Sequence, residues 1–254
     1  MKKYFHDSLV VFRRSLTIAL QNPVWMVISL MQPILYLALF GPLLQRIANT
    51  PGFPPGDAWQ VFVPGLLVQL GIFGAFFVGF GIIAEWRNGV IDRMMVTPAS
   101  RTALISGRVL RDVLMITVQG AVLMGVAYLF GLRISIQAVI GGLFVVALLG
   151  AAFAYLSYAA GLALKSEDAL APLVNTIALP ILLLSGILLP MTLAPRWLQI
   201  LSDINPIKHV VDAERAIFRG DLFGPSTLLG VGLAVAIVFL AAYVGNLVFR
   251  QQTR

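Results

Sequence analysis

The chain has 254 residues, of which 59% are hydrophobic and only 11% are charged. Because a soluble globular domain carries about a quarter charged residues, this composition excludes an ordinary soluble fold and indicates a membrane protein. The absence of cysteine excludes disulfides, iron–sulfur clusters and thiolate metal sites. The net charge of +7 comes from Lys and Arg beside apolar runs, which is typical of membrane-flanking segments rather than of nucleic-acid binding. We expect residues 1–254 to form a single membrane domain.

Residues 1–22 are predicted to form an amphipathic helix that lies on the membrane surface. Arg13 and Arg14 interrupt the apolar core that a cleavable signal peptide requires, so none is expected. Apolar residues recur every three or four positions and therefore share one face. An ordinary cytoplasmic helix packed on a partner is the alternative. The apolar face consists of Phe5, Leu9, Phe12, Leu16 and Leu20, and the opposite face of Lys3, Asp7, Arg14, Thr17 and Gln21.

Six uncharged apolar runs are long enough to cross a bilayer, which takes about 20 residues. They lie at about 24–44, 61–84, 113–131, 134–164, 169–189 and 226–249. An even number of spans places both termini on one side, and cations concentrate there, which puts the termini in the cytoplasm of a cell membrane. The termini share their side with Lys2, Lys3, Arg13, Arg14, Arg87, Arg93, Arg101, Arg108, Arg111, Lys165, Arg250 and Arg254, against Arg46, Arg133, Arg196, Lys208, Arg215 and Arg219 on the other.

Residues 85–112, between the second and third spans, form a longer connection than a turn between two helices needs. Gly89 is predicted to end the second span, and residues 90–96 to form a short apolar-rich helical stretch. Thr97 and Pro98 suit the N-cap and the first position of the next helix. The two adjacent methionines suit a surface that packs against a partner. A solvated loop that only obeys the positive-inside rule is the alternative.

Residues 190–225, between spans five and six, are predicted to form two short amphipathic helices. Neither is long enough to cross the membrane, so we expect a re-entrant pair that enters the outer leaflet. Backbone at the break between them must then be buried in protein or face water. A small extracellular cap is the alternative. The residues singled out in this outer segment are Pro190, Trp197, Asn205, Pro206 and Arg215.

The sequence lacks the motifs of ATP-binding and metal-dependent enzymes, so no catalytic residue and no metal site are predicted. It contains no G-x-x-x-x-G-K-[ST] sequence, and no cofactor is expected on this chain. Gly79, Gly81 and Ala84 match a loose dinucleotide pattern, but they lie inside an apolar span, where chance or helix packing explains them.

Within their predicted bounds the six spans contain no ionisable side chain, which argues against an ion-coupled carrier. Polar side chains that remain there either bond between helices or line a substrate path. Gln32 and Asn175 suit a path because each lies in a span that contains proline, whose freed carbonyl groups need partners. The candidate path residues are Gln32, Tyr36, Gln69 and Asn175.

Two stretches resemble type-2 ABC transporter permeases, most closely the antibiotic-resistance branch of daunorubicin exporters. One runs from Glu85 to Arg101 and ends in Thr-Pro-Ala-Ser-Arg; the other is the outer segment, with Asn205-Pro206 and Asp212-Ala-Glu-Arg. The resemblance covers essentially the whole chain. It implies an all-α integral membrane protein with six transmembrane helices, an N-terminal interfacial helix and an outer re-entrant helix pair.

The resemblance also implies partners. A second permease, identical or related, and a separate nucleotide-binding subunit that carries ATP and magnesium are expected, together with membrane lipid and without nucleic acid. The function implied is export of a hydrophobic or amphipathic drug, lipid or lipid-linked compound. An ion-coupled multidrug carrier and a membrane-embedded enzyme or scaffold are the alternatives. The residues implied to couple the chain to the ATPase are Glu85, Gly89, Ile91, Asp92, Arg93, Met94, Met95, Pro98 and Arg101.

Overall fold

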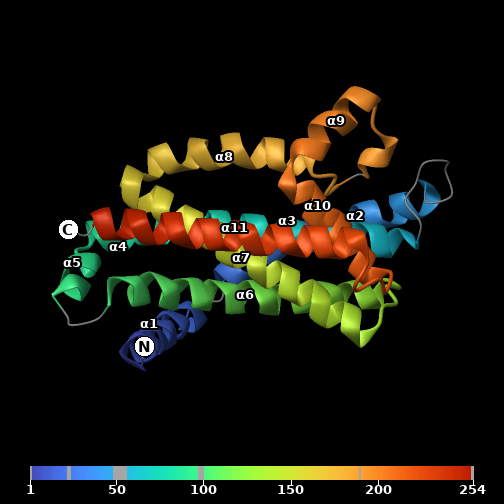
Figure 1. The fold of residues 1–254 in the computed structure, drawn as a ribbon. Helices are drawn as coiled ribbons and strands as arrows, with labels where there is room; N and C mark the ends of the chain where they lie inside the picture. Colours follow the sequence, from blue (N-terminus) through green and yellow to red (C-terminus); the bar gives the residue numbers. More distant parts are fainter. Residues whose placement is uncertain (1, 22–23, 48–55, 97–99, 189, 253–254) are drawn as a thin grey trace.

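The computed structural model describes residues 2–21, 24–47, 56–96, 100–188 and 190–252, which form helices joined by short turns. Figure 1 shows the long helices lying side by side, with α9 projecting from one end of the bundle. In chain order the elements are α1 (Lys2–Gln21), α2 (Val24–Ile47), α3 (Ala58–Phe76), α4 (Val78–Arg87), α5 (Val90–Met95), α6 (Arg101–Leu129), α7 (Ile136–Leu164), α8 (Glu167–Leu184), η1 (Met191–Leu193), α9 (Arg196–Ile204), α10 (Pro206–Phe218) and α11 (Pro225–Gln252).

Six candidate membrane spans are present, as the apolar runs predict: α2, α3 with α4, α6, α7, α8 and α11. The third differs in its start, since α6 begins at Arg101 rather than near residue 113. The helix therefore also includes Arg108, Arg111 and Asp112, which precede the predicted third span, whereas residues 113–131 contain no Asp, Glu, Lys, Arg or His. Charge marks where an apolar run ends, but a helix continues past it wherever its polar groups find partners.

Helix α7 lies at the centre, packed against α3, α4, α6, α10 and α11. It is apolar on all sides and rich in small residues, which lets neighbouring backbones approach closely. A Cβ atom added at Gly161 would lie 2.7 Å from the Gly79 carbonyl oxygen, and one at Gly79 would lie 2.5 Å from that of Ser157. Gly79 thus serves helix packing, as expected.

The second span is broken at Phe77, between α3 and α4. The Ser157 hydroxyl of α7 accepts a hydrogen bond from the Gly79 N–H at 2.9 Å and donates to the Phe76 carbonyl at 2.5 Å. Backbone groups freed by a break inside a membrane need such partners, so one serine permits the irregularity.

Helix α1 packs on α6, as the two helices at the lower left of Figure 1 show. Its buried face does not coincide with the apolar face expected from the sequence, because Val11 is buried whereas Phe5, Leu9 and Leu20 are exposed. Tyr4 donates to the Ser106 hydroxyl at 2.8 Å, and the Asp7 carboxylate accepts from the Ser100 N–H at 3.2 Å. One face of α1 is therefore fixed to the bundle while an apolar face stays exposed.

Candidate functional site

Helix α5 lies at one end of the bundle, beyond α4 and near the C-terminal end of α11 (Figure 1). Gly89 precedes it in the left-handed conformation, with φ 64° and ψ 17°. That conformation favours glycine and turns the chain out of the direction of α4. The prediction that Gly89 ends the second span is confirmed.

The side chains of α5 divide into an inner and an outer set. Ile91 is buried, with 3% of its surface exposed, and Met94 packs half-buried against the core. The prediction that both fill a groove on a partner is thus wrong for Ile91, which the bundle itself covers. Asp92 and Arg93 are exposed, and Val96, which follows the helix, is 86% exposed. Pro98 and the Met95 side chain lie outside the described residues.

A buried arginine connects α4, α5 and α6. Arg108, on α6, forms an ion pair with Glu85 at the end of the second span, and its Nη2 lies 3.4 Å from the Met94 sulfur. Arg108 is only 3% exposed. Glu85, which the sequence assigned to partner contact, is thus an internal ion-pair partner. The ion pair joins α4 to α6, and the contact with Met94 adds α5, so Arg108 links α5 to the spans. Removing Arg108 would leave the Glu85 carboxylate without this partner.

The start of α6 is fixed by two more sets of polar contacts. Arg111 Nε lies 3.0 Å from Asp112 Oδ1, and the Tyr158 hydroxyl of α7 donates to Asp112 Oδ2 at 2.5 Å. Ser100 is the N-cap of α6, and the cap and helix start predicted at Thr97 and Pro98 lie outside the described residues. Arg101 is the first helical residue and is exposed. The residues around the start of α6 did not indicate that Tyr158, far away in the chain, bonds to Asp112.

The four candidate path residues are not brought together. Gln32 donates to the Tyr36 hydroxyl at 3.3 Å on α2, and Gln32 is exposed. Asn175 is exposed on α8, of which only Leu170, Val174 and Ala178 are buried. Gln69, in contrast, is buried inside the bundle. No shared lining forms within one chain among these four.

The outer segment contains two helices separated at Asn205, as predicted. The Asn205 side chain accepts from the Ile207 N–H at 3.0 Å, and Pro206 occupies the first turn of α10. Helix α9 exposes an apolar face, including Trp197 at 64% and Ile204 at 75%. Helix α10, by contrast, is packed against α3, α7 and α11.

Arg215 anchors α10 to the bundle. Its Nε donates to the Val61 carbonyl at 3.0 Å and its Nη2 to the Gly186 carbonyl at 2.6 Å. Burial, opposed by Asp212 and assisted by the nearby Arg219, lowers the pKa of Arg215 to about 10. The side chain therefore stays charged at neutral pH.

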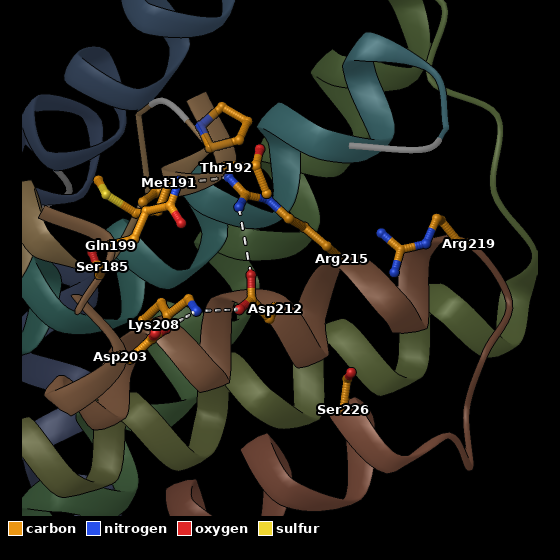
Figure 2. Close-up of a pocket in the computed structure, with 12 residues that line it drawn as sticks. Ser185, Met191, Thr192, Gln199, Asp203, Lys208, Asp212, Arg215, Arg219 and Ser226 are labelled. Carbon is orange, nitrogen blue, oxygen red and sulfur yellow. Dashed lines mark hydrogen bonds and ion pairs between the residues drawn. The ribbon is translucent and has the colours of Figure 1, made fainter. Parts of the chain in front are cut away.

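Beside Arg215 lies a cavity of about 260 Å³, shown in Figure 2. Pro190 and Met191 line it from the segment after α8, and Lys208 lines it from α10. Lys208 Nζ lies 2.5 Å from Asp203 Oδ1 and 3.7 Å from Asp212 Oδ2. The hydrogen bond from Lys208 lowers the pKa of Asp203, so this carboxyl group is charged at neutral pH. No sequence signal placed these residues around one cavity.

Comparison with known proteins agrees with this architecture. A family model described as ABC-2 type transporter matches residues 7–218. The chain belongs to the ABC-2 type transporter family. It is 27% identical over 263 residues to a transport permease named ycf38 from Cyanophora paradoxa, with 98% of this chain and 89% of the relative covered. It is 24% identical over 200 residues to the daunorubicin resistance ABC transporter permease DrrB1 of Streptomyces coeruleorubidus, with 78% and 70% covered.

As an ABC-2 family member with six apolar helices, the chain is a multi-pass membrane protein and a transport permease. The resemblance identified from residues 85–101 and the outer segment is thereby confirmed. The family match begins in α1 and ends at the last residue of α10, so it includes α5 and the residues that line the outer cavity except Arg219 and Ser226.

Proposed function

We propose that this permease is the membrane subunit of an ATP-driven exporter, and that a separate ATPase carrying ATP and magnesium docks on α5. The observation that carries the proposal is the geometry of α5. Gly89 separates it from α4, its outer face exposes Asp92, Arg93 and Val96, and Arg108 connects its inner face to two spans. A short helix with an exposed outer face and an inner face fixed to spans is suited to transmit movement.

The permease has a defined orientation in the membrane, a partner permease and a hydrophobic or amphipathic substrate. The end with α5 faces the cytoplasm of the cell membrane, and the outer segment lies on the far side as a re-entrant pair. Exposed apolar faces on α2 and α8 contact lipid and a second permease, which brings Gln32 and Asn175 to a common path. A hydrophobic or amphipathic compound is the substrate, consistent with the name of the daunorubicin resistance relative.

Reconstitution tests the proposal against its alternatives. Proteoliposomes that contain the permease and its partner ATPase should take up a fluorescent amphipathic drug only with magnesium and ATP. Uptake driven by an imposed pH gradient without ATP would instead indicate an ion-coupled carrier. Absence of transport in both conditions would favour a scaffold or an enzyme.

Charge reversal on α5 tests the docking surface. Arg93→Glu should reduce copurification of the ATPase on the order of tenfold, because an exposed interface charge is converted to repulsion. Arg250→Glu is the matched control, since Arg250 is also exposed and lies in the last turn of α11. Equal copurification with both variants would contradict docking on α5.

Substitution of Arg108 distinguishes binding of the ATPase to α5 from transmission of its movement to the spans. Arg108→Ala should leave the ATPase bound but reduce ATP-dependent uptake, because α5 keeps its exposed face while Met94 loses the Arg108 contact that links α5 to Glu85 and α6. Normal uptake by this variant would show that movement does not pass through Arg108.

A further inference from the structure

The outer cavity has an excess of positive charge. Three cations line it, Lys208, Arg215 and Arg219, against two carboxylates, Asp203 and Asp212. Lys208 contacts both carboxylates, and Arg215 Nη1 lies 3.8 Å from Asp212 Oδ1. Lys208 and Arg215 thus balance the two acids. Arg219 remains, and in the described part of the chain no carboxylate lies within ion-pair distance of it.

Arg219 is an exposed residue that lines the cavity. A Cβ atom added at Gly56 would lie 3.5 Å from Arg219 Cδ, so the aliphatic stem lies beside the start of α3. In Figure 2 the Arg219 guanidinium points toward the side of Arg215 and Asp212, away from its own backbone. The guanidinium group thus belongs to the lining of the cavity.

The two arginines repel each other in this arrangement. Arg219 is one of the groups that lower the pKa of Arg215, after burial. Arg215 cannot move away, because its Nε and Nη2 are bonded to the carbonyl groups of Val61 and Gly186. An anion between the two guanidinium groups would relieve this repulsion.

We propose that the outer cavity binds a phosphate group between Arg219 and Arg215. Guanidinium groups match the geometry of phosphate oxygens and can form paired charge-assisted hydrogen bonds with them. The cavity of about 260 Å³ is large enough for a phosphate with a small substituent. The proposal goes beyond export itself, since binding at this site needs neither ATP nor the ATPase.

Two sources can supply the phosphate: the headgroup of an anionic phospholipid or a soluble phosphate. Binding is measured on the full-length permease in detergent, by native mass spectrometry with phosphatidylglycerol or phosphatidylcholine and by calorimetry with inorganic phosphate. Arg219→Gln should weaken binding on the order of tenfold, as expected for loss of one charge-assisted pair. Arg219→Lys should restore part of it. Arg46→Gln is the control, because Arg46 is an exposed arginine in the last turn of α2 that does not line the cavity.

The outcomes separate the two sources. Retention of phosphatidylglycerol over phosphatidylcholine that depends on Arg219, without phosphate binding, supports the lipid source. Phosphate binding that depends on Arg219, without lipid preference, supports the soluble source. The proposal is overturned if the wild-type protein binds neither probe, or if Arg219→Gln and Arg46→Gln bind both probes equally well. Both variants should elute as the wild type does on size exclusion, which shows that a loss of binding is not a loss of folding.

Discussion

Gln69 and Glu214 each bury side-chain polar atoms that have no hydrogen-bond partner within the described chain. Burying such atoms costs about 1–3 kcal/mol for a neutral group. A Cβ atom added at Gly142 of α7 would lie 2.8 Å from Glu214 Oε1, so the carboxyl group is enclosed by protein. Both side chains reduce stability where they are, which makes each a sensitive position for substitution.

Gln69→Met should raise the melting temperature, because it replaces a buried amide without partners by an apolar group of similar size. Gln119→Met on α6 is the control. It should lower the melting temperature, since Gln119 Nε2 donates to the Ser29 hydroxyl at 2.7 Å. Thermal unfolding in the same detergent measures both. A lower melting temperature for Gln69→Met would contradict the absence of a partner, and loss of drug uptake with normal stability would place Gln69 on the substrate path.

Glu214 should make stability depend on pH. Burial raises its pKa well above the ordinary value of 4.5, so the folded chain keeps a proton that the unfolded chain loses as pH rises past 4.5. The folded state then binds more protons, and stability falls from that pH up to the raised pKa.

Glu214→Gln removes this titration, so its melting temperature should exceed that of the wild type by a margin that grows with pH. Thermal unfolding of both proteins in the same detergent, at a series of pH values from the ordinary pKa of 4.5 upward, provides the measurement. A constant difference across this range would mean that Glu214 has a partner or an ordinary pKa.

At the scale of elements, α1 is fixed to α6 through a glycine. A Cβ atom added at Gly107 would lie 2.6 Å from the Ser8 carbonyl oxygen and 2.8 Å from Val11 Cβ. The approach is closest where the backbones meet, so a side chain there must separate the two helices.

Gly107→Val should release α1 while the six spans stay folded. Faster hydrogen exchange and protease cleavage within residues 2–21 would reveal the release. Gly125→Val is the matched control on the same helix, because nothing lies within 4 Å of a Cβ atom built at Gly125. Equal protection of α1 in both variants would contradict the contact.

The helices themselves were largely predictable, but their contacts were not. The number of spans, the break at Asn205 and the turn at Gly89 follow from local chemistry: apolar length, side-chain capping and freedom of φ. The partners of Arg108 and Asp112 did not follow, because they come from residues far away in the chain. Ile91 was assigned to a partner because helical periodicity shows which residues share a face, not which neighbour covers it.

At the scale of the whole molecule, α5 lies at the same end of the bundle as the C-terminal end of α11 (Figure 1). The cations on that side exceed those on the other, which predicts that this end is cytoplasmic. The chain has no cysteine, so a maleimide that reacts with the permease labels only the introduced cysteine.

Asp57→Cys should react with an impermeant maleimide on intact cells, whereas Asn88→Cys should react only after permeabilisation. Both residues are exposed, and they lie near opposite ends of the second span. Mass-tag labelling measures the two rates. The reverse pattern would invert the proposed orientation and place α5 outside the cell, where no ATPase could reach it.

By itself, the sequence determined that this chain is a helical membrane protein with six spans and ABC-2 family signatures, because apolar length and local motifs do not depend on what packs against them. Only the tertiary structure decided that Arg108 holds α5, that Ser157 supports the break at Phe77, and that three cations and two acids share the outer cavity. These features depend on distances between segments far apart in the chain. Such distances are set by how closely the helices pack, and no local pattern of residues records them.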